Sequence, residues 1–143
     1  MDLREQLIGF EGWRHAAYPD PLTRGAPWAI GVGHCGNEVH EGLVWTDDQI
    51  NAALDADIAE KTAQCRQHLP WFDTLEAPRR AVIVGMCFQM GIKGLLGFPR
   101  MLDRVRDQRW EDAANEIRTS LWAKQTQKRA SRLAQQLATG EWQ

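Results

Sequence analysis

The spacing of apolar residues divides the chain into a short helical start, an irregular middle and a long helical remainder. Apolar side chains from Leu3 to Ile8 recur at helical intervals and predict a helix over residues 2–12. Residues 13–45 lose this period because glycine, proline and aromatic residues crowd together, and Trp28–Val32 resembles a short strand. We therefore expect a small irregular β-sheet over residues 13–45.

Helical patterning returns at residue 46. Thr46-Asp47-Asp48-Gln49 has the form of a capping box and predicts the start of a long helix that ends before Pro70. Residues 79–90 are apolar on nearly every side, which is typical of a central, buried helix. We expect Gly91 and Gly94 to break that helix.

Three more helices are expected after this break. Pro99 is a favourable first-turn residue for a helix that ends near Gln108. Two further helices are predicted over residues 110–119 and 127–138, and Gly140 closes the last one. The pattern as a whole predicts an α+β fold, a small sheet beside a helical body, with a cleft between the two parts.

Length and composition agree with one globular domain. The chain has 143 residues with 43% hydrophobic and 25% charged residues, which excludes disordered and fibrous classes. We expect a single domain over residues 1–143, made of the helix 1–12, a sheet lobe at 13–45 that carries the cleft, and a helical lobe at 46–143.

Cysteine usage and apolar runs bear on location. Cys35, Cys65 and Cys87 cannot close a disulfide framework and match no zinc motif, so we expect folding in a reducing compartment. No run reaches about 18 apolar residues, and the first six residues lack a basic head. We therefore expect no membrane span and no secretion signal.

Charge is uneven along the chain. Residues 1–78 hold 5 Lys/Arg and 13 Asp/Glu, whereas residues 79–143 hold 12 and 6. A basic half indicates a positive face suited to an anionic polymer, and the alternative is two solvated helical surfaces of opposite sign. The basic run has little aromatic interleaving, so nucleic acid is not an expected partner; its members are Lys124, Lys128, Arg129 and Arg132.

Two carboxylates stand out near the start. Glu11 continues the four-residue spacing of Leu3 and Leu7, so it projects from the inward stripe of the first helix, where desolvation favours a protonated carboxyl group. Asp20 lies between two prolines in a stiff loop that can aim a carboxylate. Together they resemble the acid and the ionised partner of a glycosidase. The alternatives are a helix-end ion pair of Glu11 with Arg14 and an ordinary turn at Asp20.

The segment after the predicted strand carries glycines and a histidine. Gly31 and Gly33 allow close approach of a ligand or helix to the backbone, and a tight hairpin is the alternative. His34 has no partner at metal-ligand spacing, so we expect a structural histidine paired with Asp55 or Asp57, and neither a metal nor a cofactor.

Tryptophan is abundant for this length. Sugar faces stack on indoles, but we expect most of these side chains to belong to the core. The seven positions are Trp13, Trp28, Trp45, Trp71, Trp110, Trp122 and Trp142.

Ordered segments along nearly the whole chain resemble the phage lysozymes of the T-even type, muramidases of glycoside hydrolase family 24. Glu11-Gly12 and Ala17-Tyr18-Pro19-Asp20 keep the family's separation of nine between two acids. The other matching segments are Trp28–His34, Arg79-Arg80-Ala81, Phe88–Gly91, Gly97-Phe98, Arg109–Ala114, Trp122–Ala130 and Thr139–Trp142.

The resemblance implies a lysozyme-like α+β fold with a small antiparallel sheet subdomain. It implies hydrolysis of the β-1,4 bond between N-acetylmuramic acid and N-acetylglucosamine in peptidoglycan, with inversion at the anomeric carbon. Glu11 is then the general acid and Asp20 the second carboxylate, Arg129 pairs with Glu11, and Phe88 and Gln89 line the sugar cleft.

One departure from the family concerns water. The family usually has threonine where this chain has Ala29, and the hydroxyl of that threonine helps hold the attacking water. Alanine offers no such hydrogen bond, and loss of one positioned hydrogen-bonding group costs on the order of a hundredfold in rate. We also place Cys35 on the cleft side, among the substrate-binding residues. The alternatives to hydrolysis are a non-catalytic wall-binding or virion structural module on the same fold, and transglycosylation.

The same resemblance sets expectations about the setting of the enzyme. We expect a bacteriolytic protein that is made in the cytoplasm of a host bacterium and reaches the cell wall through holin-type membrane holes. We also expect it to act as a monomer.

Overall fold

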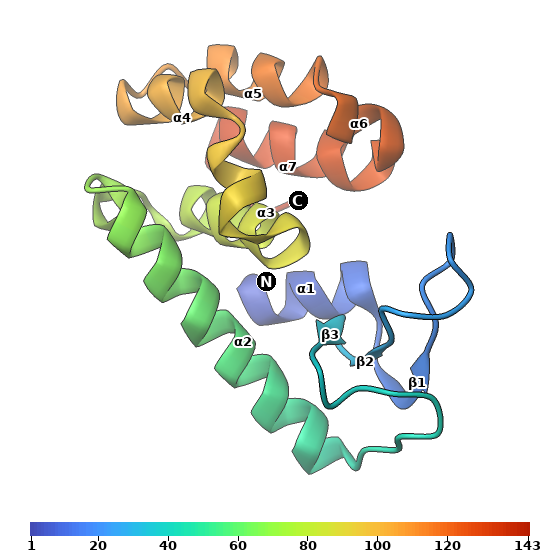
Figure 1. The fold of residues 1–143 in the computed structure, drawn as a ribbon. Helices are drawn as coiled ribbons and strands as arrows, with labels where there is room; N and C mark the ends of the chain where they lie inside the picture. The colour runs from blue at the N-terminus through green and yellow to red at the C-terminus, as the bar shows by residue number, and fades with distance from the viewer. The chain divides into compact units, whose positions relative to one another are not determined.

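The structure, a computed structural model, describes residues 1–143 (Figure 1). The chain forms two compact units, one of residues 4–60 and one of residues 1–3 with 61–143. The first unit carries the sheet, and the second is helical throughout its regular structure.

The sheet unit confirms the predicted order of a helix, an irregular sheet and a second helix. The sheet is antiparallel with strand order β1-β2-β3, and Tyr18 and Cys35 both pair with Ala29 of the central strand. The elements are α1 (Leu3–Glu11), β1 (Arg14–Tyr18), β2 (Ala29–Gly31), β3 (His34–Cys35) and α2 (Asp47–His68).

The predicted capping box begins α2. The backbone N–H of Thr46 donates to Oε1 of Gln49 over 2.8 Å, and the N–H of Gln49 donates to the Thr46 hydroxyl over 3.2 Å. These reciprocal bonds satisfy two amides that the first turn would otherwise leave without partners. The helix ends at His68, before Pro70 as expected.

The helical unit is built around α3, whose residues from Ala81 to Cys87 are all buried. Helix α7 packs against α5 and α3, and Figure 1 shows these helices together in yellow, orange and red. The elements are a 3-10 turn η1 (Phe72–Thr74), α3 (Ala77–Leu96), α4 (Pro99–Arg106), α5 (Trp110–Arg118), α6 (Leu121–Gln125) and α7 (Gln127–Thr139).

The break in the central helix differs in part from the prediction. Gly91 breaks the helical geometry, with φ 77° and ψ 169°. Gly94, in contrast, keeps helical geometry. Its missing side chain gives room to Met90, whose Cβ lies 2.8 Å from the place that a Gly94 Cβ would take. Gly140 closes α7 in the left-handed conformation, as predicted.

The expectation for tryptophan is wrong. Trp122 is the one buried tryptophan, at 9% exposure, and the other six are half-buried. Several use their rings or N–H groups at the edge of a unit: Trp45 packs on the His34 ring, and Trp110 lies beneath the Arg79 guanidinium, 3.9 Å from the ring centre. Tryptophan fits such positions because one part of its ring can be buried while another part remains in contact with water.

No single helix has the length and apolarity that a membrane span requires. Helices α3 and α4 taken together reach those values, but their axes are bent by 104°.

Candidate active site

Glu11 is the last residue of α1, and its carboxylate packs against the turn between β2 and β3. The Glu11 carboxylate contacts Gly33, whose φ is 64°. A Cβ on Gly33 would stand 2.9 Å from Cδ of Glu11, closer than such atoms approach. The segment is a hairpin, and the missing side chain of Gly33 also lets the Glu11 carboxylate lie close to the backbone.

Asp20 organises the loop between β1 and β2. Its Oδ1 accepts hydrogen bonds from the backbone N–H groups of Leu22 at 2.8 Å and Thr23 at 3.1 Å. Its own N–H donates to Gly25, and its carbonyl accepts from Arg24, so the loop closes on the aspartate. The carboxylate therefore combines the predicted turn role with a fixed direction.

Tyr18, Ala29 and Cys35 form a row across the sheet, because each outer residue pairs directly with Ala29. Partial desolvation, and then the charges of Glu11 and Cys35, raise the pKa of Tyr18. Partial desolvation, and then the charges of Glu11, Asp57 and Asp20, raise the pKa of the Cys35 thiol. The row of three and both carboxylates thus share one neighbourhood within residues 4–60.

His34 links the β2–β3 hairpin to α2, in agreement with the predicted pairing of this histidine with a carboxylate of the long helix. Its Nδ1 lies 2.7 Å from Asp57 on α2, and its Nε2 lies 2.6 Å from Glu38. The hydrogen bond to Asp57, followed by the other effects of the two carboxylates and opposed by burial, raises the pKa of His34 to about 9. The other predicted candidate, Asp55, pairs with Arg4 instead.

Arg14 has a different partner from the one weighed for it. Its guanidinium lies over the Tyr18 ring, 4.6 Å from the centre. Such a cation over an aromatic face holds the start and the end of β1 together.

Three predicted residues belong to the helical unit. Phe88 and Gln89 lie on α3, and the Gln89 side-chain oxygen is buried without a hydrogen-bond partner. Arg129 on α7 is 9% exposed, and its Nη2 lies 3.5 Å from the Gly85 carbonyl. Their expected roles toward the sugar and Glu11 stay predictions.

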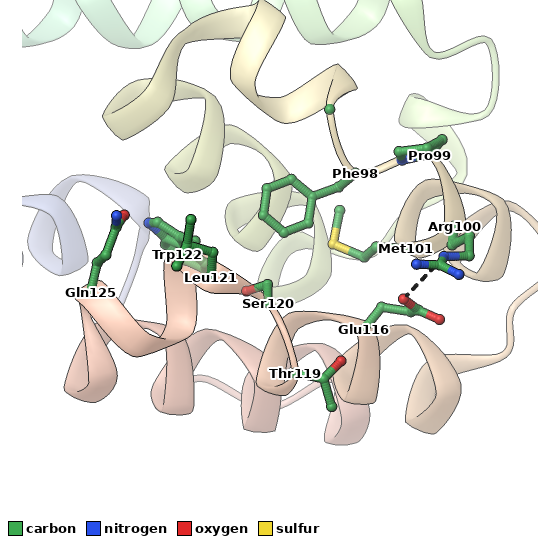
Figure 2. A pocket seen from close by; sticks show the side chains of 11 residues that line it. Phe98, Pro99, Arg100, Met101, Glu116, Thr119, Ser120, Leu121, Trp122 and Gln125 are labelled. Carbon is green, nitrogen blue, oxygen red and sulfur yellow. Dashed lines mark ion pairs between the residues drawn. The ribbon is translucent and has the colours of Figure 1, made fainter.

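A pocket of about 600 Å³ in the helical unit was not predicted (Figure 2). Phe98 meets Trp122 edge to face, with ring centres 6.3 Å apart, and Arg100 pairs with Glu116 at 3.7 Å across the opening. The indole N–H of Trp122 is buried without a partner. One signal in the sequence could have indicated the pocket, since Phe98 and Trp122 both fall in segments that match the lysozyme pattern.

No group of three or more His, Cys, Asp or Glu side chains in residues 1–143 is arranged to hold a metal ion.

A small antiparallel sheet with a carboxylate at the end of the preceding helix, followed by a helical body, defines a lysozyme-like α+β fold. The chain belongs to the phage lysozyme family, whose sequence model matches residues 8–138.

The relatives include both a phage spike protein and proteins described as lysozymes. The chain is 29% identical to the pre-baseplate central spike protein Gp5 of Enterobacteria phage T4, over 98% of this chain and 28% of that protein. It is 31% identical to "Probable T4-type lysozyme 1" of Dictyostelium discoideum, over 60% of this chain and 51% of that protein. A second lysozyme of that organism, "Probable T4-type lysozyme 2", is 32% identical over 48% of this chain and 41% of its own length. The chain thus spans about half, or less, of the length of these relatives.

Proposed function

We propose that this chain is a muramidase that hydrolyses the β-1,4 bond between N-acetylmuramic acid and N-acetylglucosamine in bacterial peptidoglycan. The observation that carries the proposal is the placing of two carboxylates by rigid means around one sheet. Glu11 is held against Gly33, and Asp20 is held by its own loop. Membership of the phage lysozyme family supports a lysozyme-like reaction at this site.

The two carboxylates have different surroundings, which suits different tasks. Asp20 accepts two backbone N–H bonds, which hold its carboxylate in a fixed direction. Glu11 is half-buried at the end of an apolar helix stripe. In the proposed reaction Glu11 donates its proton to the glycosidic oxygen as the bond from that oxygen to the anomeric carbon breaks.

Water completes the reaction. Its oxygen bonds to the anomeric carbon from the opposite side, and its proton passes to Asp20, so the configuration inverts. Glu11 regains a proton and Asp20 loses one to solvent before the next cycle.

The test compares wild type with Glu11→Gln on purified peptidoglycan, with release of reducing ends as the measurement. Glutamine keeps the shape of the side chain but cannot donate the proton, so we expect a loss of about a thousandfold with an unchanged circular dichroism spectrum. Equal turnover in the variant would remove Glu11 as the acid. The anomer of the first product, followed by NMR, tests inversion.

A second function has an observation in its favour. Nearly the whole chain aligns with part of a central spike protein, and Ala29 offers no polar atom at the centre of the sheet. A wall-binding or structural module would bind peptidoglycan but release no reducing ends. Sedimentation with insoluble peptidoglycan, measured beside the turnover assay, separates the two functions.

Monomeric action and passage to the wall through holin-type holes stay predictions. Gel filtration at working concentration tests the first, and lysis of cells with and without a co-expressed holin tests the second.

A further inference from the structure

The centre of the candidate site lacks a polar side chain. Ala29 occupies the middle of the row across the sheet, and its side chain is a methyl group at 9% exposure. The proposed hydrolysis needs a water molecule with a fixed direction beside Asp20, and one carboxylate alone leaves such a water free to turn. A second hydrogen-bonding group is therefore required near Ala29.

Strand pairing places Cys35 next to that position. Ala29 and Cys35 are directly opposed in the β2–β3 pair, so their side chains leave the same face of the sheet with Cβ atoms about 4.5–5.5 Å apart. Tyr18 occupies the other side of Ala29 in the same row. The row thus offers two polar groups, the phenol of Tyr18 and the thiol of Cys35.

The electrostatic surroundings favour Cys35 over Tyr18. Both Glu11 and Asp20 act on the Cys35 thiol, whereas Glu11 is the one of the two that acts on Tyr18. Charge effects of this kind fall with distance, so both carboxylates belong to the electrostatic surroundings of the thiol. Partial desolvation, and then these charges, raise the pKa of the Cys35 thiol, so the protonated thiol has one S–H to donate and a sulfur that accepts.

The thiol is also available. Cys35 is exposed, and its thiol donates a long hydrogen bond of 4.0 Å to the Gly33 carbonyl, which a water molecule can replace. Cys65 and Cys87, in contrast, are fully buried in the helical unit.

We propose that the Cys35 thiol holds the attacking water in place beside Asp20, on the face of the sheet that Ala29 leaves without a polar group. The inference rests on the proposed muramidase activity and names a residue that positions its water. The bonds made and broken are those of the hydrolysis above, and Cys35 keeps its proton and forms no covalent bond.

A double-mutant cycle tests the proposal with variants Cys35→Ala, Ala29→Thr and the two together. We expect Cys35→Ala to lower kcat about tenfold with little change in KM, since a thiol is a weaker partner than the groups whose loss costs a hundredfold. We expect Ala29→Thr to supply a hydroxyl at the same place. In that background the loss of Cys35 should cost less than about threefold, because coupled residues are not additive.

Two readouts separate this role from a purely structural one. Cys35→Ser supplies a hydroxyl and should restore kcat to at least the wild-type value. In Cys35→Ala, an added sugar acceptor should compete better with the poorly held water, so the share of chain-extended product should rise. A structural role would lower activity equally in both backgrounds and leave this share unchanged.

Chemical modification gives an independent measurement. Iodoacetamide should modify Cys35 in the native protein and abolish turnover, while Cys35→Ser treated in the same way keeps its activity. Mass spectrometry checks that Cys65 and Cys87 stay unmodified.

The outcomes distinguish a failure of the role proposed for Cys35 from a failure of the proposed muramidase activity. An active wild type with unchanged kcat and product share in Cys35→Ala overturns the role of Cys35 alone. A wild type and an Ala29→Thr variant that both bind peptidoglycan without cleaving it overturn the proposed activity, and the role of Cys35 with it.

Discussion

The two compact units hold their charged groups in different ways. Residues 4–60 contain three Lys/Arg and ten Asp/Glu, so carboxylates outnumber cations. Many of them are satisfied by neutral or histidine donors, as Asp20 is by backbone amides and Asp47 by the N–H of Trp13 and by His15. These two carboxylates are held by hydrogen-bond donors and not by lysine or arginine.

The helical unit uses charge for structure. Several of its arginines pair with exposed carboxylates, as Arg109 does with Asp112 and Arg106 with Asp103, each three residues away. These pairs lie at helix ends and on exposed faces, where each contributes little alone. In the proposed reaction the sheet unit supplies both carboxylates, whereas the helical unit holds most of the buried apolar side chains.

Arg79 is the exception among the exposed pairs, and it allows the largest test of the helical unit. Its guanidinium donates to the carbonyls of Leu137 at 2.8 Å and Ala138 at 3.1 Å, pairs with Glu76, and covers the ring of Trp110. These contacts close the carboxyl end of α7. We expect Arg79→Ala to lower the free energy of unfolding by about 3 kcal/mol, measured by urea denaturation.

Arg66→Ala is the matched control for Arg79→Ala. Arg66 pairs with Asp73 at 3.0 Å, but both side chains are more than half exposed, so its loss should change stability far less. Equal losses in the two variants would show that charge alone, and not the closing of α7, sets the effect of Arg79.

Gly33→Ala tests the sheet unit, and its expected effect is on activity. The added Cβ would collide with the Glu11 carboxylate and displace it, and a displacement of about 1 Å costs on the order of a hundredfold in rate. The measurement is release of reducing ends per folded molecule.

Gly42→Ala supplies the control for that variant. Gly42 also has a positive φ, 91°, but nothing lies within 4 Å of its added Cβ. Both variants therefore carry the backbone cost of about 1–2 kcal/mol, and only Gly33→Ala adds the collision. If the two lose activity equally, the contact between Glu11 and Gly33 has no part in the reaction.

His34 gives the sheet unit a dependence on pH. Its pKa is raised to about 9, chiefly by Asp57, from an ordinary value near 6.5. The folded state thus binds the proton more tightly than the unfolded state. The stabilisation is complete below about pH 6.5 and is lost as the pH rises through 9.

Urea denaturation from pH 6 to pH 10 measures this loss, which we expect to be about 1–2 kcal/mol after allowance for solvent screening. His34→Gln should show a flatter profile over the same range. His15→Gln is the control, since that histidine is 55% exposed and pairs with Asp47, which is 68% exposed. A wild-type profile that stays flat to pH 10 would contradict a charged His34.

The sequence predicted the parts of the fold that local chemistry dictates. The capping box at Thr46, the first-turn Pro99 and the closing Gly140 each mark a helix end, because each satisfies or removes a terminal backbone group. It also predicted that His34 pairs with a carboxylate of the long helix, since this histidine has no metal-ligand partner nearby and that helix carries Asp55 and Asp57.

What the sequence missed depends on tertiary packing. Helix α6 was not predicted, although Ser120 caps it by accepting from the Ala123 N–H, because five residues are too short for a helical period to show. Gly94 stays helical because packing with Met90 outweighs its low helix propensity. The neighbourhood of Cys35 follows from strand register, which a strand of two residues does not reveal in sequence.

Thr46→Ala is the smallest of the expected effects, and it tests whether the acidic unit depends on local hydrogen bonds as its carboxylates do. The hydroxyl of Thr46 accepts from the Gln49 N–H, and its loss should cost about 1 kcal/mol of unfolding free energy, measured in urea. Thr46→Ser keeps the hydroxyl and should stay within a few tenths of wild type. If serine costs as much as alanine, the methyl group of Thr46 and not its cap bond stabilises α2, and the sheet unit relies on packing as the helical unit does.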